Sequence, residues 1–460
     1  MSNTVARAMS QDCFCVKETT KGTAIYPTAA TERVVTAGTA EINQQASFSD
    51  SEEVVNSLDV MDRFQDQMGA GTWSVPIYIR TSGTKGTPPM GKILYESLMG
   101  LETIVTDTSV TYEQATTKPS FTIWMRKSHT VFYATGACTE AGKLNFTNKG
   151  GSKVDFSGGF MRMGWAGTSA ANGATANGSG SGYLTDHAQY PAGTTSIHLD
   201  TGTGTVLEGD TVTFAGDLTV YFVETGCAGD GDSDITIRAP GLTTTLDEDV
   251  AMTITGSSKI TLDSGGGKLY TAGTRIEIGA DNNTNAGYEI ASVTVASDKL
   301  FMAEAVTCAD NAEITGFLPT YTAVGTVLEN KNLAITFDGT SKNLKSLSVD
   351  VNSPVAWQTD EITTSGYVTE YIEDRRAIKC SLDVLFREQD VSYFYDATQN
   401  TQVSVIAIND GGAGDKCTIN IPQTELEVPQ TQTSSPTVSL SIAGTGLGST
   451  GEDSCSIVFE

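Results

Sequence analysis

Basic residues are scarce in this 460-residue chain, which has 28 Lys and Arg against 55 Asp and Glu. Binding nucleic acid through counterion release needs clustered Lys and Arg, so the formal net charge of −27 disfavours that class of function. Proline is rare, at 12 residues, whereas glycine reaches 47, a balance typical of short strands and many turns. Hydrophobic residues make up 39%, which is enough to form buried cores, so a wholly disordered acidic chain is excluded.

Long apolar segments are also missing. No run reaches the roughly 18 residues of a membrane-spanning helix, and stretches such as Val403–Ile408 have the length of a strand. The first residues contain Arg7 but no apolar region, so we expect no signal peptide. The 8 cysteines are too widely spaced for a disulfide scaffold. We therefore expect free thiols in a protein that is assembled in a cytoplasm.

The composition changes along the chain and predicts an interrupted β domain. A chain of this length is expected to form roughly two to three domains. Gly, Ala and Ser dominate one stretch, which predicts a flexible linker, and Thr, Asp and Gly dominate the segment after it. We divide the chain into a polar N-terminal arm, the first part of a β domain, the linker, an insert and the second part of the β domain: 1–70, 71–165, 166–195, 196–320 and 321–460.

The insert contains a weak internal repeat. Three short patterns recur at offsets of 63, 64 and 60 residues: Ile197–Gly202 with Ile260–Gly265, Gly209 with Gly273, and Ile254–Gly256 with Ile314–Gly316. Self-similarity at this spacing predicts two small β-modules of about 60 residues. Two helical patterns lie outside the insert, at Lys92–Met99 before Gly100 and at Arg387–Thr398.

The residues that carry chemistry do not form a recognisable active site. The three histidines, His129, His187 and His198, do not show metal-ligand spacing, so we interpret them as exposed or turn residues. Cys13 and Cys15 form a C-x-C pair without a second pair. The segment 230–234, Asp-Gly-Asp-Ser-Asp, begins like a calcium loop but has Ile235 where glycine is required, which favours a solvated turn.

Three further patterns are better explained by structure than by ligand binding. The glycines of 178–182 follow no predicted strand and open no helix, and those of 265–267 precede a strand without a Gly-Lys-Ser/Thr sequence, so neither run matches a phosphate-binding loop. The aromatic and basic residues of Phe121–Lys127 could stack a nucleobase but are more typical of a strand. Arg375 and Arg376 follow two acidic residues, which favours an ion pair. We assign no catalytic, cofactor-binding, metal or specific DNA-binding residues and expect no enzyme.

A series of patterned strands resembles the tail tube (major tail) proteins of long-tailed bacteriophages. The resemblance covers roughly residues 70–165 and 325–460, and consists of strands and glycines rather than catalytic signatures. The segments that carry it are Val75–Tyr78, Leu94–Gly100, Pro119–Trp124, Tyr133–Cys138, Leu144–Phe146, Val154–Phe160, Leu347–Asn352, Val391–Thr398, Val403–Asn409, Thr437–Ala443 and Cys455–Glu460.

The resemblance implies a mainly β fold, a tail tube sandwich or barrel domain with one flanking helix. It implies stacked rings, commonly hexameric, that form the hollow tube of the virion tail after assembly in the host cytoplasm. The partners it implies are further copies of the chain, the tape measure protein, the tail terminator and the distal tail or baseplate proteins. Double-stranded DNA would pass through without specific binding, and acidic residues lining the lumen would repel its phosphates.

Two other classes stay open at this point. A virion or cell-surface β-rich adhesin or decoration protein would also be acidic, modular and rich in Thr and Gly. A polysaccharide-degrading enzyme on a β scaffold would need a pair of carboxylates, and 55 acidic residues provide many candidates. Residues 196–320 hold 5 Lys and Arg against 19 Asp and Glu, a net charge of −14, so about half of the acidity lies in the insert, which we expect to decorate the outside of the tube.

Overall fold

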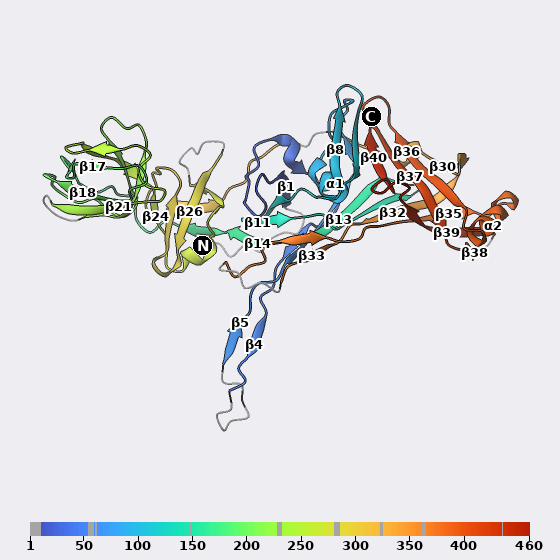
Figure 1. Cartoon of the computed structure of the whole chain (residues 1–460), viewed down its shortest axis with the longest axis horizontal. Coiled ribbons are helices and arrows are strands. Elements are labelled where there is room, and N and C mark those ends of the chain that lie inside the picture. The colour runs from blue at the N-terminus through green and yellow to red at the C-terminus, as the bar shows by residue number, and fades with distance from the viewer. Residues whose placement is uncertain are drawn as a thin grey trace. The chain divides into compact units, whose positions relative to one another are not determined.

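The computed structural model describes residues 11–53, 59, 62–147, 149–227, 232–279, 286–322, 325–359, 365–434 and 436–460. The protein is mainly β, as expected, with 51% strand, two helices and several antiparallel sheets that include a half-barrel (Figure 1). The described residues form two compact units. Unit 1 comprises residues 128–131 and 164–319, and unit 2 comprises residues 11–127, 132–163 and 320–460.

A sheet of 15 strands dominates unit 2. Its main path runs in the order β3 (Glu41–Asn43), β6 (Gly71–Tyr78), β13 (Lys153–Phe160), β12 (Ala141–Thr147), β32 (Leu344–Asn352), β35 (Ala377–Leu385), β39 (Thr437–Leu447), β37 (Lys416–Leu426), β36 (Gln402–Asp410), β30 (Leu333–Phe337) and β31 (Thr340–Lys342). Four strands branch from it: β38 (Gln430–Ser434) on β39, and β40 (Ser456–Phe459), β9 (Ser109–Gln114) and β8 (Gly100–Val105) in sequence from β37. All of these neighbours are antiparallel, and hydrophobic and polar side chains alternate along the strands, so one face is buried.

A second sheet of unit 2 places residues 11–17 in the interior. Its five strands lie in the order β14 (Arg162–Ala166), β11 (Thr130–Ala137), β10 (Phe121–Lys127), β1 (Gln11–Lys17) and β2 (Arg33–Val34). All seven residues of β1 pair with β10, and Phe14 is fully buried. The sequence predicts an arm at residues 11–17, but they form a central strand. The alternating side chains of β1 have apolar partners on both faces of the sheet, which explains this position.

One hydrophobic core joins both sheets of unit 2 and helix α1 (Lys92–Met99). It includes Cys13 and Ile123 from the smaller sheet, Val154 from the larger one and Leu94 from α1. The helix begins after Gly91 and ends at Gly100, whose φ of 109° suits glycine and whose N–H donates to the carbonyl of Glu96. The helix and its stop therefore lie where the sequence predicts them.

Smaller elements complete unit 2. Three strand pairs lie outside the two sheets: β7 (Arg80–Thr81) with β29 (Thr326–Val327), β33 (Val355–Trp357) with β34 (Tyr371–Glu373), and β4 (Phe48–Asp50) with β5 (Arg63–Gln65). Helix α2 (Ser392–Thr398) follows the 3-10 turn η5 (Glu388–Val391), within the predicted helical segment. Two further 3-10 turns are η1 (Ala30–Glu32) and η4 (Asn330–Asn332). The two helices, α1 and α2, both lie within the segments for which the sequence predicts a helical pattern.

Unit 1 contains two six-stranded sheets with equivalent connections. The first has the order β16 (Leu184–Thr185), β18 (Ser196–Asp200), β21 (Ser233–Ile237), β20 (Tyr221–Thr225), β19 (Asp210–Phe214) and β23 (Met252–Ser257). The second has the order β24 (Lys259–Thr261), β27 (Lys299–Met302), β26 (Tyr288–Thr294), β25 (Arg275–Ile278), β28 (Glu313–Gly316) and β15 (Thr168–Ala170). Each sheet consists of five strands of one module and one strand from residues 166–195, β16 in the first sheet and β15 in the second. If the five module strands are named a to e along the chain, both sheets have the order a-d-c-b-e.

The repeated sequence patterns occupy matching places in the two modules. Ile197 and Ile260 lie on strand a, while Ile254 and Ile314 lie on strand e. Gly209 and Gly273 precede strand b with φ values of 90° and 82°. Unit 1 also contains the pair β17 (Gln189–Tyr190) and β22 (Leu246–Asp247), and the 3-10 turns η2 (Gly266–Leu269) and η3 (Val295–Ser297).

The Gly/Ala/Ser-rich residues 166–195 run along both modules. β15 pairs with β28 of the second module, and Ser181 bridges to Thr203 of the first. A Cβ atom at Gly178 would lie 2.2 Å from the carbonyl oxygen of Thr205, so the absence of a side chain permits this close approach. Much of this stretch is thus part of the modules. No helix among the described residues is long and apolar enough to cross a membrane.

Candidate functional site

Strand β8 is an edge strand that carries exposed apolar side chains. Among the described residues it pairs with β9 alone. Leu101, Ile104 and Val105 are 45%, 47% and 49% exposed. An unpaired apolar edge is a template for pairing with another chain, and soluble proteins normally protect such edges with charges, proline or a covering element. We call this strand with its three apolar side chains the β8 edge.

The hairpin that presents the β8 edge is held from several sides. Glu102, between the exposed residues, accepts a hydrogen bond of 2.8 Å from the hydroxyl of Tyr112 and lies 3.9 Å from Nζ of Lys92. Asp107 turns the chain with a φ of 56°. A Cβ atom at Gly86 would lie 2.5 Å from the amide nitrogen of Asp107, so the loop around Gly86 fits closely against the tip. The edge is therefore presented in a defined conformation.

A second apolar surface lies where β35 ends and α2 begins. We call it the α2 patch, and its side chains are 39% to 66% exposed: Leu385, Val391, Tyr395 and Val438. Leu385 and Val438 lie on adjacent strands, since Leu385 pairs with Ser439 and the N–H of Phe386 donates to the carbonyl of Val438. Val391 and Tyr395 are four residues apart, so they lie on the same side of the helical segment.

Buried contacts beneath the α2 patch fix the helix. Tyr393 packs edge-on against Phe337 with ring centres 4.8 Å apart. Nζ of Lys342 lies 3.2 Å from Asp390, whose other carboxylate oxygen accepts a hydrogen bond from the N–H of Arg387. Burial disfavours the charged form of Lys342, but its contacts with Tyr393 and Asp390 outweigh burial, so the pKa of Lys342 is raised. A fixed helix loses little conformational freedom when another surface binds to it.

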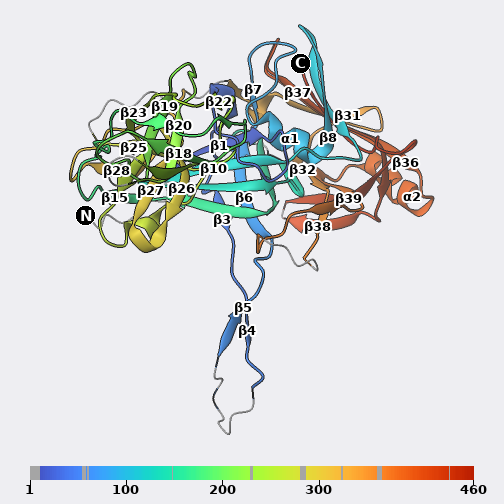
Figure 2. The ribbon, with the colours of Figure 1, turned by 60° about the vertical axis from the view of Figure 1, so that its left-hand side comes forward.

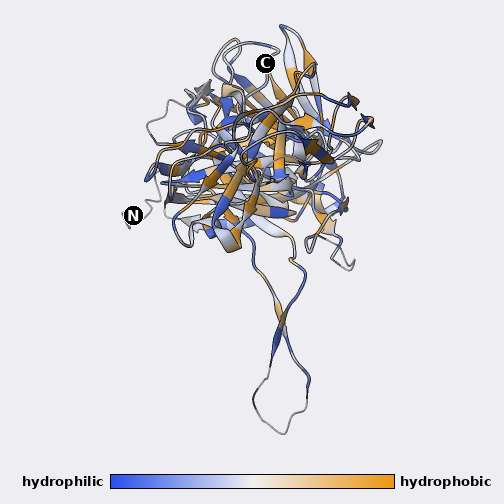
Figure 3. Ribbon diagram, turned by 90° about the vertical axis from the view of Figure 1, so that its left-hand side faces the viewer, coloured by the Kyte–Doolittle hydropathy of each residue, from blue (hydrophilic) through white to orange (hydrophobic). Residues whose placement is uncertain are grey.

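The β4–β5 hairpin leads away from the other strands of unit 2 (Figures 2 and 3). Phe48 and Phe64 are 49% and 56% exposed. Arg63 lies over the Phe48 ring at 5.4 Å and pairs with Asp50 at 2.8 Å. These contacts join the two strands to each other, while the described residues provide them with no further strand. Isolated two-stranded hairpins are marginally stable, so this one would gain order from a partner surface.

The solvent-facing side of the large sheet carries a row of alternating charges. The register aligns Asp155 of β13, Lys143 of β12, Asp350 of β32 and Lys379 of β35 on adjacent strands. Nζ of Lys143 lies 3.9 Å from Asp350. Opposite charges in neighbouring strands support each other, so this row is charge-balanced rather than acidic.

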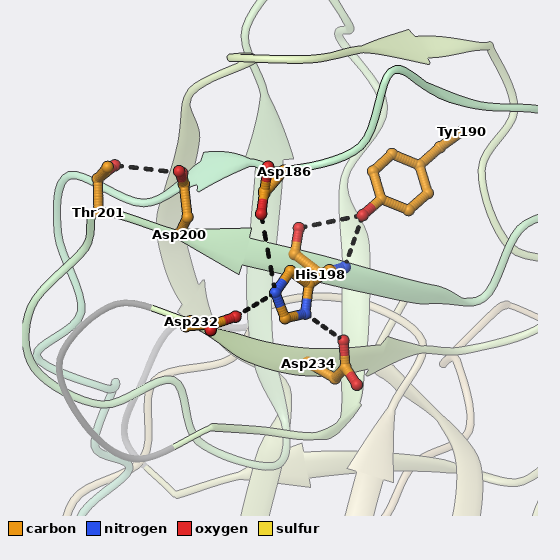
Figure 4. A network of polar contacts seen from close by, with 7 residues as sticks. All are labelled: Asp186, Tyr190, His198, Asp200, Thr201, Asp232 and Asp234. Atoms are coloured by element: carbon orange, nitrogen blue, oxygen red, sulfur yellow. Dashed lines mark hydrogen bonds and ion pairs between the residues drawn. The ribbon is translucent and has the colours of Figure 1, made fainter.

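Unit 1 contains a polar cluster centred on His198 (Figure 4). Nδ1 of His198 lies 2.7 Å from Asp234, and Nε2 contacts Asp232 and lies 3.9 Å from Asp186. The hydroxyl of Tyr190 accepts a hydrogen bond from the His198 amide at 2.9 Å and donates to its carbonyl at 3.2 Å. We call His198 with its three aspartates the histidine cluster.

Sheet register explains why these residues meet. His198 on β18 pairs directly with Asp234 on β21. On the other side of β18, Thr185 pairs with Leu199, so Asp186 comes opposite His198 and its N–H donates to the His198 carbonyl. The hydrogen bond with Asp234 raises the pKa of His198 above its usual value, partial burial opposes the rise, and Asp232 adds to it.

Of the other residues singled out in the sequence, Asp232 and Asp234 belong to this cluster, whereas the remaining histidines and the C-x-C pair do not. His129 lies exposed in the turn between β10 and β11, and the exposed His187 contacts the Gln189 carbonyl of its own turn at 2.9 Å. Cys13 and Cys15 are buried free thiols in β1. Asp230 lies outside the described residues, whereas Asp232 and Asp234 bind His198. Within the part of the chain that is described, no three His, Cys, Asp or Glu residues converge on a point that could hold a metal ion.

The candidate nucleic-acid contacts have structural roles. Trp124 is fully buried and donates its ring N–H to the carbonyl of Ile25 at 2.7 Å, so its faces are not accessible to a nucleobase. Arg376 donates from Nε to the hydroxyl of Ser353 at 3.1 Å, where an ion pair with a neighbouring acid was expected. Partial burial lowers the pKa of Arg376.

Sequence patterns alone do not single out the β8 edge, the α2 patch or the histidine cluster. The exposure of Leu101 and Ile104 depends on β8 ending a sheet, and the His198 contacts depend on strand register. The one available signal was the repeat itself, because Ile197–Gly202 and Ile260–Gly265 align His198 with Thr261 and thereby mark the histidine as specific to one module. No family model matches the chain, and no curated protein is significantly similar to it.

Proposed function

We propose that this protein is a structural virion protein that assembles into stacked rings, six subunits to a ring, forming a hollow phage tail tube for DNA. The resemblance of the strand series in unit 2 to tail tube proteins supports this function. The structural observation that carries it is the β8 edge. Among the described residues this fixed, apolar strand pairs only with β9, and its other side is free to pair with a further chain.

A ring needs two different surfaces on each subunit. A contact between unlike surfaces closes into a ring when the rotation permits, whereas a contact between like surfaces gives a dimer. The β8 edge and the α2 patch differ in shape, one being a strand edge and the other a helix with two strand ends. We propose that the β8 edge of one subunit contacts the α2 patch of the next, and that the β4–β5 hairpin orders on a neighbouring copy.

The expected strength of this contact follows from the exposed area. Full burial of a Leu, Ile or Val side chain contributes roughly 1.5–3 kcal/mol, and the three residues of the β8 edge retain about half of their exposure. Covering them should therefore contribute about 1 kcal/mol each, or about 3 kcal/mol for one contact. That corresponds to roughly a hundredfold change in a dissociation constant.

Ile104→Lys tests the contact. A lysine there keeps its charge in solvent in the free subunit but would place it in the interface of the assembly. We expect the wild type to form rings or tubes of constant bore in negative-stain electron microscopy, and Ile104→Lys to remain a folded monomer. The matched control is Leu218→Lys in unit 1, where an apolar residue that is 99% exposed is replaced in the same way. It should assemble like the wild type.

A mixing experiment identifies the partner of the β8 edge. Ile104→Lys retains an intact α2 patch, and Tyr395→Lys retains an intact β8 edge. If these surfaces bind each other, each variant alone stays monomeric, whereas the equimolar mixture forms heterodimers in sedimentation velocity. A mixture that remains monomeric contradicts this pairing, and a wild-type protein that is monomeric over wide ranges of salt and concentration contradicts the proposed function itself.

A further inference from the structure

The histidine cluster of unit 1 has a protonation requirement that can be deduced from its contacts. A neutral imidazole has one N–H donor and one acceptor nitrogen, whereas ionised carboxylates only accept hydrogen bonds. In this cluster Nδ1 faces Asp234, while Nε2 faces Asp232 and Asp186. Both ring nitrogens therefore need a proton, and the geometry is that of an imidazolium ion.

The charges around His198 make this cation important to the cluster. Among the described residues, His198 is the only cationic group within 4.0 Å of Asp186, Asp232 or Asp234. Asp200 lies two residues further along β18 and hydrogen-bonds to the hydroxyl of Thr201 at 3.3 Å. Tyr190 contacts the His198 backbone, and its own pKa is raised chiefly by burial. Once the imidazolium loses its proton, three carboxylates face one another without a compensating charge.

We propose that His198 is a pH-operated clasp, which in its doubly protonated form holds Asp186 and the start of β21 to β18 and releases them when the ring is deprotonated. The clasp joins three neighbouring segments of one sheet: the end of β16, the middle of β18 and the first residues of β21. It belongs to the first module alone, because Thr261 occupies the equivalent place in the second. The proposal concerns unit 1 and is independent of the proposed tube.

The sign of the pH effect follows from linkage between protonation and folding. A histidine whose pKa is raised in the folded state contributes stability that is fully present below its unfolded pKa of about 6.5. This contribution is lost as the pH rises through the folded pKa. The clasp is thus closed in mildly acidic solution and opens on the alkaline side of the ordinary histidine range.

Hydrogen–deuterium exchange of the full-length protein measures the clasp directly. Peptides that cover residues 233–237 and 184–190 are followed from pH 5.5 to 9.5 in the wild type and in His198→Gln. Comparison at the same pH removes the intrinsic pH dependence of exchange. We expect at least fivefold faster exchange in His198→Gln below pH 6.5, and a ratio that falls toward one as the pH rises.

Two further variants distinguish a clasp from a merely structural histidine. Asp234→Asn keeps the side-chain size but removes the charge, so the midpoint of the wild-type pH dependence should shift downward. His187→Gln replaces the neighbouring exposed histidine and should leave exchange unchanged at every pH. The proposal is overturned if the wild type and His198→Gln exchange at the same rate, or if their rates differ by the same factor at every pH. An unchanged midpoint of the pH dependence in Asp234→Asn also overturns it.

Discussion

Glu18 provides the sharpest test of where the N-terminal residues lie. Its carboxylate, 7% exposed, accepts four hydrogen bonds. Oε1 accepts from the hydroxyl of Thr122 at 2.9 Å and the N–H of Gly136 at 2.8 Å, and Oε2 accepts from the hydroxyl of Ser120 and the N–H of Gly22, both at 2.8 Å. These donors lie on β10 or directly before it, on β11 and in the loop after β1. The carboxylate therefore joins β1 to the rest of its sheet.

The effect of Glu18→Gln can be worked out from these four donors. A glutamine amide has one oxygen and one NH₂ group, so two donors lose their acceptor. The less costly orientation directs the NH₂ group toward Ser120, whose hydroxyl can reverse, and Gly22, which is half-buried and can contact water. The remaining two bonds change from charge-assisted, at roughly 1.5–3 kcal/mol, to neutral, at roughly 0.5–1.5 kcal/mol. The weakening of these two bonds accounts for about 2–3 kcal/mol, and with the lost Gly22 bond the free energy of unfolding should fall by about 3–5 kcal/mol.

Urea unfolding followed by tryptophan fluorescence measures this loss. Three of the four tryptophans, Trp73, Trp124 and Trp357, lie in unit 2, so the signal reports mainly on that unit. Glu18→Ala, which leaves all four donors without an acceptor, should be less stable than Glu18→Gln. The control Glu41→Gln changes an exposed side chain on β3 and should stay within about 0.5 kcal/mol of the wild type. A Glu18→Gln protein as stable as the Glu41→Gln control would refute the buried position of β1.

Three further outcomes are expected. Gly158→Ala should be strongly destabilised in the same urea assay, since its Cβ would lie 2.0 Å from the Cys138 carbonyl oxygen, whereas Gly69→Ala, with no atom within 4 Å, should not be. Because burial raises the pKa of Cys138, Cys380, Cys417 and Cys455 to about 12, the native protein should resist Ellman's reagent at pH 8, and its unfolding free energy should fall as the pH rises from about 9 to 12. The N–H of Gly316 donates to the carbonyl of Gly167 at 3.0 Å, so a deletion of residues 168–315 that joins these glycines should leave unit 2 folded in circular dichroism. A deletion of 196–320 would leave β15, β16 and β17 without their partner strands, so that protein should aggregate.

Local patterns predicted the elements whose causes are local. The helix Lys92–Met99 ends at Gly100 because the stop is a property of one glycine, and the two modules follow from a repeat visible in the sequence. The turn between β8 and β9 carries no glycine signal, because it is made by Asp107 in a left-handed conformation. The burial of β1 depends on β10, which is about a hundred residues away, and the cluster at His198 depends on the register of three strands. Contacts of that kind leave no pattern in a short window of sequence.

The distribution of charge changes how the proposed tube would handle DNA. Repulsion by an acidic lumen was the initial expectation, yet the described row on the large sheet alternates Asp155, Lys143, Asp350 and Lys379, and residues 196–320 carry a net charge of −14. Adhesion of DNA depends on the number of phosphates that Lys and Arg can neutralise, not on net charge alone. On this face Lys143 is 3.9 Å from Asp350, and Nζ of Lys153 lies 5.2 Å from the centre of the Tyr78 ring. If this face lines the lumen, Lys143 and Lys153 already have partners within the sheet, so DNA would slide because these cations are occupied and not because carboxylates repel it.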